Sequence, residues 1–380
     1  MAKNKRFIKQ FVSRNKVLVA AVIFVSAIIS SVGFMYVNAL LQPEYKESTK
    51  TETSSDKTMA ATESAKQAAE KEAAVAKATQ QKKQEAATQE EAKAAASVQA
   101  SKTIQSSGGA VSPAPKPKGL YVDAASKTGQ PSEIGSQATS VWLGNWSGNE
   151  RQNVNATVSK AAAQGKVASF VMYYIQNRDC GDWSQGGAAN SAAYQAWVRE
   201  VAAGIGNREA IVIVEPDALG HDNCLTDQRY ADLSYAVSTL ATQTRASVYL
   251  DAGNSNWVSA STMASRLSKA NIAQARGFAL NVSNYQTTEN SIRYGEQMSS
   301  KTGKSFVIDT SRNGQGPGSD WCNPRGRGLG KKPAIVLSGK LDAYLWVKVP
   351  GESDGNCNGG PAAGTWWEDY AQELIRNAVY

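Results

Sequence analysis

The chain has only one histidine, His221, among its 380 residues. This excludes a metal site built from several histidines, and any Ser-His-Asp arrangement would have to use this single side chain. The sequence also lacks a G-x-S-x-G motif and a glycine-rich phosphate loop, which argues against a serine hydrolase and a nucleotide-dependent enzyme. Because His221 lies in the loop-like stretch Gly220-His-Asp-Asn223, an ordinary exposed histidine is the simpler interpretation. Catalysis is left to carboxylates, and neither a metal ion nor an organic cofactor is indicated.

Cysteine is also scarce, and its distribution is informative. The four cysteines are even in number and show no C-x-x-C spacing; they are Cys180, Cys224, Cys322 and Cys357. Two disulfides in an exported protein fit this pattern better than a zinc site. Four cysteines allow three pairings, and the sequence cannot choose among them. We predict pairing in sequence order, Cys180–Cys224 and Cys322–Cys357, because it would brace two loops that carry acids.

Positive charge is concentrated at the N-terminus. Six of the net +8 charges precede the first acid; they belong to Lys3, Lys5, Arg6, Lys9, Arg14 and Lys16. The rest of the chain is close to neutral, so we expect no nucleic-acid partner. Residues 1–16 are predicted to form a basic cytoplasmic tail, which implies export of the chain beyond the next segment.

Residues 17–39 form a long apolar segment. Val17 to Val37 contains no charged residue, and its about 21 positions match the roughly 17–25 residues that cross a bilayer. A signal anchor is one interpretation, and a cleaved signal peptide is the other, because Val37-Asn38-Ala39 offers small residues at a suitable spacing. The protein is therefore predicted to be extracellular, either anchored to the cell membrane or secreted. The membrane is a partner only if this segment stays uncleaved.

Residues 40–118 are rich in Ala, Lys, Glu, Gln, Thr and Ser and have few aliphatic or aromatic residues. Such a segment cannot bury enough apolar surface to offset the entropy lost on ordering. We predict a spacer with a partly helical stalk that ends in the extended stretch Pro113-Ala-Pro-Lys-Pro117. A coiled coil is the alternative, but large residues are missing from the a and d positions. The globular domain then comprises residues 119–380.

The globular part repeats a pattern of apolar strand, polar loop and amphipathic helix. The predicted strands are Val141–Trp146, Val167–Ile175, Ala210–Val214, Ala246–Leu250, Gly277–Val282, Ser305–Ile308 and Asp342–Val349. The helix-like stretches include Ser191–Gly204, Asp227–Thr244 and Thr288–Lys301. Nearly continuous Val, Ile and Leu indicate strands buried on both faces, as in a parallel sheet covered by helices. Polar residues cluster after the strand ends, which favours an α/β barrel over a doubly wound open sheet.

Acidic residues follow the ends of four predicted strands. They are Asp179; Glu215 and Asp217; Asp251; and Glu352 and Asp354. A lone aspartate at a strand end is often only a helix N-cap, but four such ends in one domain suggest a shared cleft. Cleavage of a glycosidic bond needs one protonated and one ionised carboxyl group. Asp217 is the best candidate acid, because burial and the charge of Asp179 would raise its pKa.

Carbohydrate binding also needs flat apolar platforms for the C–H faces of sugar rings. All nine tryptophans lie in the globular part. Trp142, Trp257 and Trp321 stand next to the loops just described, and we predict that they are sugar platforms. Trp346 and the pair Trp366-Trp367 are predicted to pack in the core or against a helix.

Five motifs, taken in order, resemble glycoside hydrolase family 6, the inverting β-1,4-glucanases, and most closely its bacterial endoglucanases. They are Tyr173-Tyr-Ile-Gln-Asn-Arg178-Asp179-Cys180, Val214-Glu-Pro-Asp217, Leu250-Asp-Ala-Gly253, Val307-Ile-Asp-Thr-Ser-Arg-Asn-Gly314 with Trp321-Cys322-Asn323-Pro324, and Trp346-Val-Lys-Val-Pro-Gly-Glu-Ser-Asp354. The resemblance covers roughly residues 119–380. It implies a distorted seven-stranded parallel (β/α) barrel and the same pairing of the cysteines in sequence order.

The resemblance also implies roles for individual residues. Asp217 would be the general acid, Asp179 the residue that keeps the pKa of Asp217 high and relays protons, and Asp354 the contested base. Tyr173 would press on the sugar before the scissile bond, and Asp251 would be structural or form part of a subsite. The implied substrate-binding residues are Tyr173, Trp142, Trp257, Trp321, Lys348, Glu352 and Asp251.

Three features bear on how closely the chain follows the family. Gln176 replaces the usual proline of the first motif, and Asn254 replaces a common histidine. The stretch Gly355-Asn-Cys-Asn-Gly-Gly360 is shorter than the loop that covers the substrate in chain-end cellobiohydrolases. A short loop implies an open cleft and cleavage within the glucan chain.

We therefore expect a monomeric, extracellular endo-β-1,4-glucanase that hydrolyses cellulose-type glucans with inversion. Three alternatives remain open: a non-catalytic surface glucan-binding protein, an enzyme of the cellobiohydrolase type, and an enzyme that acts on its producer's own glucan during synthesis. The presence of Asp179, Asp217 and Asp354 argues against a pure binding protein, because binding alone does not need desolvated acids.

Overall fold

A computed structural model describes residues 110–181 and 184–380 of the chain. These residues belong to one compact unit, which spans Lys83–Tyr380. The predicted cytoplasmic tail, the anchor or signal segment and most of the spacer lie outside the described residues, so those predictions stay open. Within the described ranges, no helix combines the length and the apolar character that a membrane span requires.

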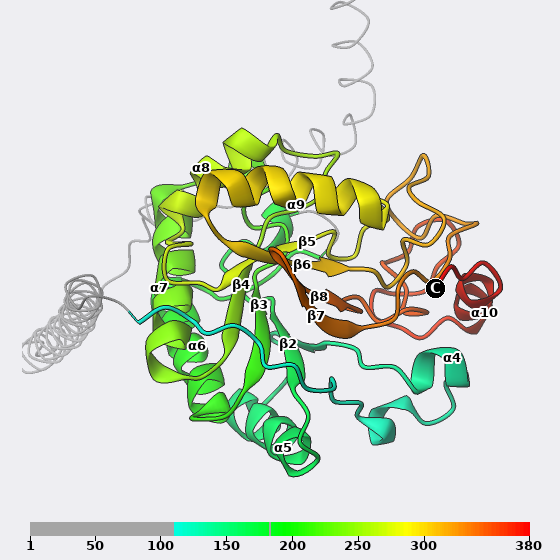
Figure 1. Cartoon of the computed structure of the whole chain (residues 1–380), viewed down its shortest axis with the longest axis horizontal. Helices are drawn as coiled ribbons and strands as arrows, with labels where there is room; N and C mark the ends of the chain where they lie inside the picture. The colour runs from blue at the N-terminus through cyan, green and yellow to red at the C-terminus, as the bar shows by residue number, and fades with distance from the viewer. Residues whose placement is uncertain (1–109, 182–183) are drawn as a thin grey trace, which may run out of the picture. The chain divides into compact units, whose positions relative to one another are not determined.

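The centre of the domain is one curled, eight-stranded sheet (Figure 1). Its strands are β1 (Val141–Leu143), β2 (Ala168–Met172), β3 (Ala210–Val214), β4 (Ser247–Asp251), β5 (Gly277–Leu280), β6 (Ser305–Asp309), β7 (Ala334–Ser338) and β8 (Leu341–Leu345). Their order across the sheet is β1-β2-β3-β4-β5-β6-β8-β7. Strands β1 to β6 and β8 are parallel to one another, whereas β7 pairs antiparallel with β8. The seven parallel strands are the seven that the apolar runs predict.

The prediction of a seven-stranded barrel is wrong in two respects. An eighth strand, β7, connects to β8 through Gly339 and Lys340, and so short a connection permits only antiparallel pairing. The sheet also does not close through strand pairing, because β1 and β7 are its two edges. Next to β1, the Ser140 N–H donates across the gap to the carbonyl oxygen of Trp346 at 3.0 Å. The fold is therefore a curled, mostly parallel α/β half-barrel.

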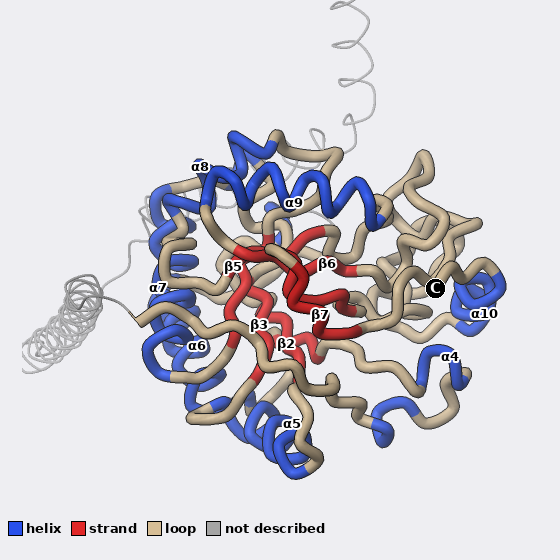
Figure 2. Tube along the Cα trace, viewed as in Figure 1, coloured by secondary structure: helices blue, strands red, loops and turns tan. Residues whose placement is uncertain are grey.

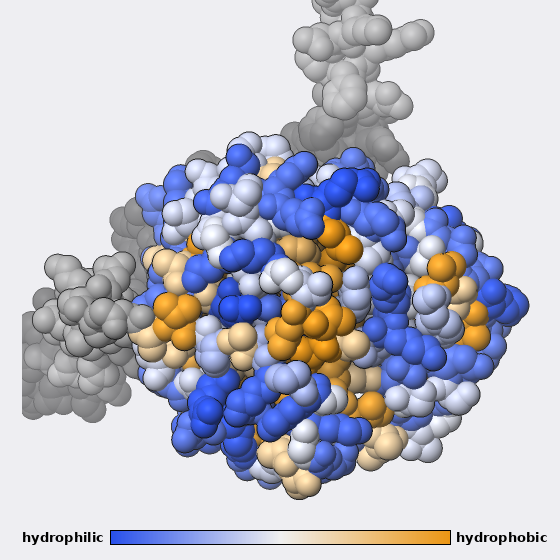
Figure 3. Space-filling model, viewed as in Figure 1, coloured by the Kyte–Doolittle hydropathy of each residue, from blue (hydrophilic) through white to orange (hydrophobic). Residues whose placement is uncertain are grey.

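Strand β7 forms an exposed apolar edge. Val336 and Leu337 of this strand are 38% and 40% exposed. Figure 3, drawn from the same side as Figure 1, shows an apolar patch in the middle of this face, where Figure 1 places β7. Lys331, Lys332 and Lys340 flank the strand in sequence, and charged residues around an edge strand discourage pairing with another chain.

Helices surround the sheet, as the tube in Figure 2 shows. They are α4 (Ser132–Gly135), α5 (Glu150–Ala163), α6 (Ser191–Ile205), α7 (Asp227–Gln243), α8 (Ala260–Lys269), α9 (Thr288–Thr302) and α10 (Glu368–Arg376), with short 3-10 turns at η1 (Ala124–Lys127), η2 (Asp179–Gly181) and η3 (Asp222–Cys224). Helices α5 to α9 each begin after a side chain that accepts a backbone N–H of the first turn; these N-caps are Asn149, Asn190, Thr226, Ser259 and Thr287. Such caps stabilise a helix start by about 1 kcal/mol. Each loop after β1 to β5 therefore runs from a strand end to a capped helix.

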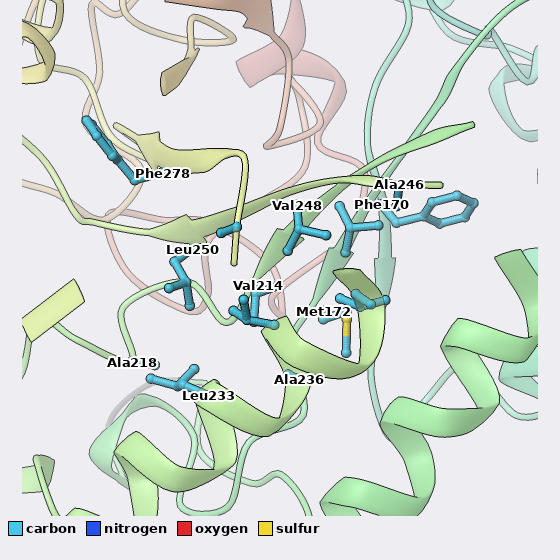
Figure 4. Close-up of a cluster of buried hydrophobic side chains, with 14 of the residues drawn as sticks. Phe170, Met172, Val214, Ala218, Leu233, Ala236, Ala246, Val248, Leu250 and Phe278 are labelled. Carbon is cyan, nitrogen blue, oxygen red and sulfur yellow. The ribbon is translucent and has the colours of Figure 1, made fainter. Parts of the chain in front are cut away.

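The strands are buried on both faces, as their composition predicts. One set of strand side chains packs outward against the helices (Figure 4) and includes Phe170, Met172, Val214 and Leu250. Leu233 of α7 belongs to the same cluster. The alternating set fills the inside of the curl and includes Val171, Ile211, Ile213, Tyr249 and Val307. Full burial of one such side chain contributes about 1.5–3 kcal/mol. These two layers give the strand ends a rigid base.

The amino-terminal ends of the strands are closed by a polar network. Asp342 of β8 accepts hydrogen bonds from the hydroxyl of Tyr249 (2.7 Å) and from Nε and Nη2 of Arg276 (2.8 Å each). The chain before α4 crosses the same end (Figure 1), where the Ser112 hydroxyl donates to the carbonyl oxygen of Ala246 at 2.7 Å. The opposite, carboxyl-terminal ends of the strands carry the loops with the predicted site residues.

Candidate active site

Glu215 fixes the loop that follows β2 to the end of β3. Its carboxylate accepts hydrogen bonds from the backbone N–H groups of Tyr174 and Ile175, each 3.0 Å from Oε2. The side chain is only 1% exposed, and burial raises its pKa to about 7 although these hydrogen bonds oppose the shift. A carboxylate that is occupied by backbone donors in this way is structural.

Two further strand-end carboxylates hold the backbone of the site. Asp251, the last residue of β4, accepts the N–H groups of Asp217 and Gly253 at 3.0 Å each. Asp309, the last residue of β6, accepts the N–H groups of Lys348 and Ser283 at 3.0 Å each. Burial raises the pKa of Asp251 to about 7 and also raises that of Asp309. The family resemblance implies either a structural role or part of a subsite for Asp251, and these contacts fit the structural role.

Asp217 lies just beyond β3 with a carboxyl group that resists ionisation. Its φ of +67° places it in the left-handed region, which is uncommon for a residue with a side chain, and the bond from its N–H to Asp251 holds it there. Burial raises its pKa well above the ordinary range, and the negative charges of Asp251 and Asp179 raise it further. The physical basis predicted for a protonated acid at this position is therefore present.

Asp179 lies in η2, where its φ is also positive, at +55°. Its Oδ2 accepts the N–H of Ser184 at 2.7 Å, and its Oδ1 lies 3.8 Å from Nε2 of His221. The His221 ring also meets Trp257 edge-on, with ring centres 4.9 Å apart. The single histidine of the chain is thus more than an ordinary loop residue, because it lies between a candidate catalytic carboxylate and a candidate sugar platform.

Tyr173 is packed beside the two carboxyl groups. Its ring lies edge-on against Trp142, with centres 5.3 Å apart, and the guanidinium of Arg178 lies 4.7 Å from its centre. Burial raises the pKa of the Tyr173 hydroxyl well above its usual value, and the charges of Asp217 and Asp179 add to this shift. The structure therefore brings Tyr173, Asp179 and Asp217 into one group.

Asp354 is an ionised carboxylate held by two cations. Arg312 Nη1 lies 2.8 Å from Oδ2, and Lys348 Nζ lies 3.4 Å from Oδ1. Oδ2 also accepts the hydroxyl of Tyr285 at 3.2 Å and the N–H of Asn323 at 3.1 Å. Burial alone would raise the pKa of Asp354, but the charges of Arg312 and Lys348 outweigh it and lower the pKa. The protonation states of Asp217 and Asp354 are thus driven in opposite directions.

Lys348 and Glu352 lie beside Asp354. Lys348 Nζ donates to the carbonyl oxygen of Ser353 at 3.1 Å, and burial lowers its pKa. Burial raises the pKa of Glu352, opposed by the charges of Lys348 and Lys127. Trp142 Nε1 donates to the carbonyl oxygen of Val347 at 2.8 Å, which joins the Trp142–Tyr173 pair to the loop of Lys348 and Asp354.

The tryptophans differ in exposure, and Trp142 is partly buried against the core. Trp257 is 40% exposed and Trp321 is 51% exposed, so both can offer a face to a ligand. Gly220 allows the position of Trp257, because an added Cβ at Gly220 would lie 2.2 Å from that ring. In contrast, Trp346 is 1% exposed and packs with residues of α10. The core role predicted for Trp346 is confirmed.

Both disulfides follow the predicted sequential pairing. Cys180–Cys224 joins the loop after β2 to the loop after β3, beside Asp179. Cys322–Cys357 joins the loop after β6 to the loop after β8, beside Asp354. Each disulfide therefore braces a loop with a candidate catalytic carboxylate.

Two residues that organise this site, Asp309 and Arg312, stand in the fourth motif, but neither was assigned a role from the sequence. Arg312 is fully buried, and Asp309 binds two neighbouring loops. Asp309 ends a strand just as Asp251 does, so the same pattern could have identified it. The motif that contains Arg312 does not reveal that its ion-pair partner is Asp354. In the described part of the chain, no group of three His, Cys, Asp or Glu side chains is arranged to hold a metal ion.

Comparisons with known proteins identify the family of the chain. Residues 118–378 match the family described as Glycosyl hydrolases family 6. Endoglucanase A from Cellulomonas fimi is 51% identical over 244 residues, which cover 62% of this chain and 54% of that protein. Endoglucanase 1 from Streptomyces halstedii is 42% identical over 248 residues, which cover 62% of this chain and 77% of that protein. The chain thus spans about half the length of the Cellulomonas fimi relative.

Solved structures show the same fold. The endoglucanase Cel6 from Mycobacterium tuberculosis, in complex with methyl-cellobiosyl-4-deoxy-4-thio-β-D-cellobioside, has a TM-score of 0.64 and 41% identity, covering 68% of this chain and 97% of that chain. The GH6 enzyme from Orpinomyces sp. Y102 has a TM-score of 0.60 and 33% identity, covering 69% of this chain and 97% of that chain. Sequence and structure therefore point to the same family.

Proposed function

Because the chain belongs to glycosyl hydrolases family 6, we propose that it is an extracellular, inverting endo-β-1,4-glucanase that acts on cellulose-type glucans. The observation that carries this proposal is the opposite environment of two carboxyl groups. Asp217 is held beside the carboxylate of Asp251, and burial with this negative charge raises its pKa. Asp354 lies between Arg312 and Lys348, whose charges lower its pKa. One protonated and one ionised carboxyl group are the equipment for hydrolysis of a glycosidic bond. The named endoglucanases among the relatives support the substrate class.

In the proposed reaction, Asp217 donates its proton to the glycosidic oxygen as the bond to the anomeric carbon breaks. A water molecule attacks that carbon from the opposite face and releases a proton, which Asp354 accepts directly or through further water. The lowered pKa keeps Asp354 ionised but also makes it a weak proton acceptor. A water-mediated route to Asp179 is therefore the second candidate path for this proton. The site is reset when Asp217 regains a proton from solvent and the base releases to solvent the proton that it accepted.

The surrounding residues would bind and distort the sugar chain. Tyr173 lies in the group with both Asp179 and Asp217, where its ring can press on the sugar that undergoes reaction. Trp142, Trp257 and Trp321 would support neighbouring sugars, and the Lys348 ammonium and Glu352 carboxyl would bind hydroxyl groups beside Asp354. The M. tuberculosis relative binds a thio-linked cello-oligosaccharide analogue, which fits a row of such subsites.

Internal cleavage is favoured by the short connection after Asp354. Ser353 pairs with the far end of this connection, because its N–H donates to Thr365 O and its carbonyl accepts the N–H of Gly364, at 2.9 Å each. The connection is thus folded back on itself and tied down by Cys322–Cys357. A compact loop of this kind would not cover the substrate, and this supports endo-cleavage over a chain-end mode.

Export is proposed from the N-terminal segment and the disulfides. The two disulfides fit an oxidising, extracellular setting, and the relatives with the name endoglucanase fit an enzyme that meets polymeric glucan. Whether residues 17–39 anchor the chain or are cleaved stays a prediction, as does its monomeric state.

The proposed function is tested by incubation of the purified chain with carboxymethylcellulose, while viscosity and reducing ends are followed together. We expect viscosity to fall quickly while few new ends appear, because internal cuts shorten the polymer most per bond broken. A slow fall with steady release of ends would instead indicate a cellobiohydrolase mode. Binding of the glucan without any cleavage would indicate a binding protein.

A further inference from the structure

We propose that Arg229, a buried arginine in the first turn of α7, is a positioning residue that holds the loops of Asp179 and Asp217 together. The proposal rests on the proposed function for the roles of these two carboxyl groups. Arg229 lies in none of the five sequence motifs, and its importance emerges only from its contacts in the fold.

The guanidinium of Arg229 binds both loops. Nη2 donates to the carbonyl oxygens of Gln176 (3.1 Å) and Asn177 (2.7 Å), which precede Asp179 in the chain. Nη1 donates to the carbonyl oxygen of Ala218, the residue directly after Asp217, at 3.4 Å. The residue is only 5% exposed, so water cannot readily replace these bonds. The planar fork of an arginine suits several carbonyl groups at once, whereas a lysine is a single point charge.

The two loops need such support because their backbones are strained. Asn177, Asp179, Cys180 and Asp217 all have positive φ, at +51°, +55°, +53° and +67°. Residues with side chains persist in this region only where their surroundings fix them. Without an anchor, these loops would relax toward more common conformations and move the carboxyl groups.

The other anchors hold different parts of the loop after β2. Glu215 binds the N–H groups of Tyr174 and Ile175 at its start, and the Cys180–Cys224 bond holds it after Asp179. Of Glu215, the disulfide and Arg229, only Arg229 binds the segment between Ile175 and Cys180, through the carbonyl groups of residues 176 and 177. Arg178, inside this segment, binds Ser184 and Gly186 of the same loop and, at 3.3 Å, Asn145 of the loop after β1, so removal of Arg229 would leave the segment without its bonds to α7.

Helix α7 gives Arg229 a rigid base. Leu233 and Ala236, on the following turns of the helix, are fully buried next to Val214 and Ala218 (Figure 4). The Thr226 side chain caps the helix by accepting the N–H of Arg229 at 3.1 Å. The guanidinium is thus placed by a packed and capped helix, as a precise site requires.

Loss of this anchor would also alter the titration of Asp217. The groups that face Asp217 are Asp251 from β4, Asp179 and Tyr173 from the loop after β2, and, beyond Asp179, His221 from the loop after β3. The charge of Asp179 helps to raise the pKa of Asp217. If the loop after β2 relaxes and Asp179 moves away, that repulsion falls and so does the pKa of Asp217. The activity should then be lost at a lower pH on the alkaline side of its profile.

The test compares Arg229→Met with Arg276→Met in the otherwise complete chain. We expect Arg229→Met to lower kcat on carboxymethylcellulose by about 10²-fold, the effect of small misplacements of catalytic groups, with little change in KM. The alkaline limb of the variant's pH–activity profile should shift to lower pH. Amide hydrogen exchange over residues 173–181 should become faster. Arg276 binds Asp342 at the opposite end of the strands, so its variant should lose stability but keep the wild-type pH profile and the wild-type exchange over residues 173–181.

Wild-type exchange over residues 173–181 and an unshifted pH profile in folded Arg229→Met would overturn the proposal. If the Met variant does not fold, Arg229→Lys is measured in the same way; it should show an intermediate loss of kcat, and a wild-type result would again overturn the proposal. If the wild-type chain itself cleaves no glucan, the proposed function fails, while the exchange experiment still decides whether Arg229 holds the loop.

Discussion

Replacement of Asp217 by asparagine is expected to lower kcat on carboxymethylcellulose by about 10²–10⁴-fold, the range that general acid catalysis contributes. Asparagine keeps the size of the side chain but has no acidic proton to give to the glycosidic oxygen. The loss should be much smaller on a dinitrophenyl cellobioside, because dinitrophenolate leaves without protonation. The measurement is kcat of the wild type and the variant on both substrates.

Asp222→Asn is the matched control for this variant. Asp222 lies in the same loop after β3, its side chain is 83% exposed, and it pairs with Arg266. We expect wild-type rates on both substrates, because the Asp222 carboxylate is largely exposed and an ion pair of such a group contributes little. An equal loss on both substrates in Asp217→Asn would contradict the acid assignment, since a missing proton donor must affect the poorer leaving group more.

Replacement of Arg312 by methionine is expected to lower the free energy of unfolding by about 3–5 kcal/mol at neutral pH, the usual cost of breaking a buried ion pair. Arg312 is fully buried, and its guanidinium pairs with Asp354, donates to the carbonyl oxygen of Ser283 at 2.7 Å and lies 4.6 Å from the centre of the Tyr285 ring. Its removal leaves a buried carboxylate with Lys348 as the remaining cation. For a domain of this size, the melting temperature should fall by about 6–20 °C.

The pH dependence of this loss has a defined sign. The folded wild type holds the pKa of Asp354 below its ordinary value, so the stability from this group is present above the unfolded pKa, about 3.9, and disappears as the pH falls through the folded pKa. In Arg312→Met, burial is less opposed and the folded pKa of Asp354 rises. The difference in stability between the two proteins should therefore be largest near neutral pH and smaller near pH 3, as urea unfolding at the two pH values would measure.

Arg151→Met serves as the control for Arg312→Met. Arg151 pairs with Glu200 at 2.8 Å, but both side chains are about half exposed, at 58% and 47%. An exposed ion pair contributes about 0–1 kcal/mol, so this variant should unfold almost like the wild type. If Arg312→Met is no less stable than Arg151→Met, the ion pair with Asp354 does not hold the site in the way described.

Much of the architecture could be predicted because its cause is local. The seven parallel strands are apolar at nearly every position, and helices α6, α7 and α9 begin at the predicted residues, after side chains that can cap them. Strand β7 was missed although Ala334–Ser338 is equally apolar. Its side chains are largely exposed, and the pattern of apolar residues does not reveal whether a run lies in the core or at an edge.

The candidate site was predictable where residues follow strand ends, and less so where contacts are long-range. Asp217 and Asp251 follow consecutive strands, so their proximity could be inferred. The contacts of Arg312 and Arg229 could not be inferred, because their partners lie far away in the sequence and become neighbours only after folding.

The two departures from the family pattern are also explained by the fold. Gln176 contributes its carbonyl oxygen, which any residue type has, and the Asn254 side chain accepts the N–H of Asn256 in the turn before Trp257.

The stereochemistry of the first product tests the proposed mechanism most directly. The purified chain is mixed with a soluble cello-oligosaccharide, and the anomeric protons are followed by NMR before the product equilibrates in water. Protonation by Asp217 with attack of water from the opposite face predicts that the α-anomer appears first and then converts to the equilibrium mixture. Initial formation of the β-anomer would mean retention through a covalent intermediate and would contradict the roles assigned to Asp217 and Asp354.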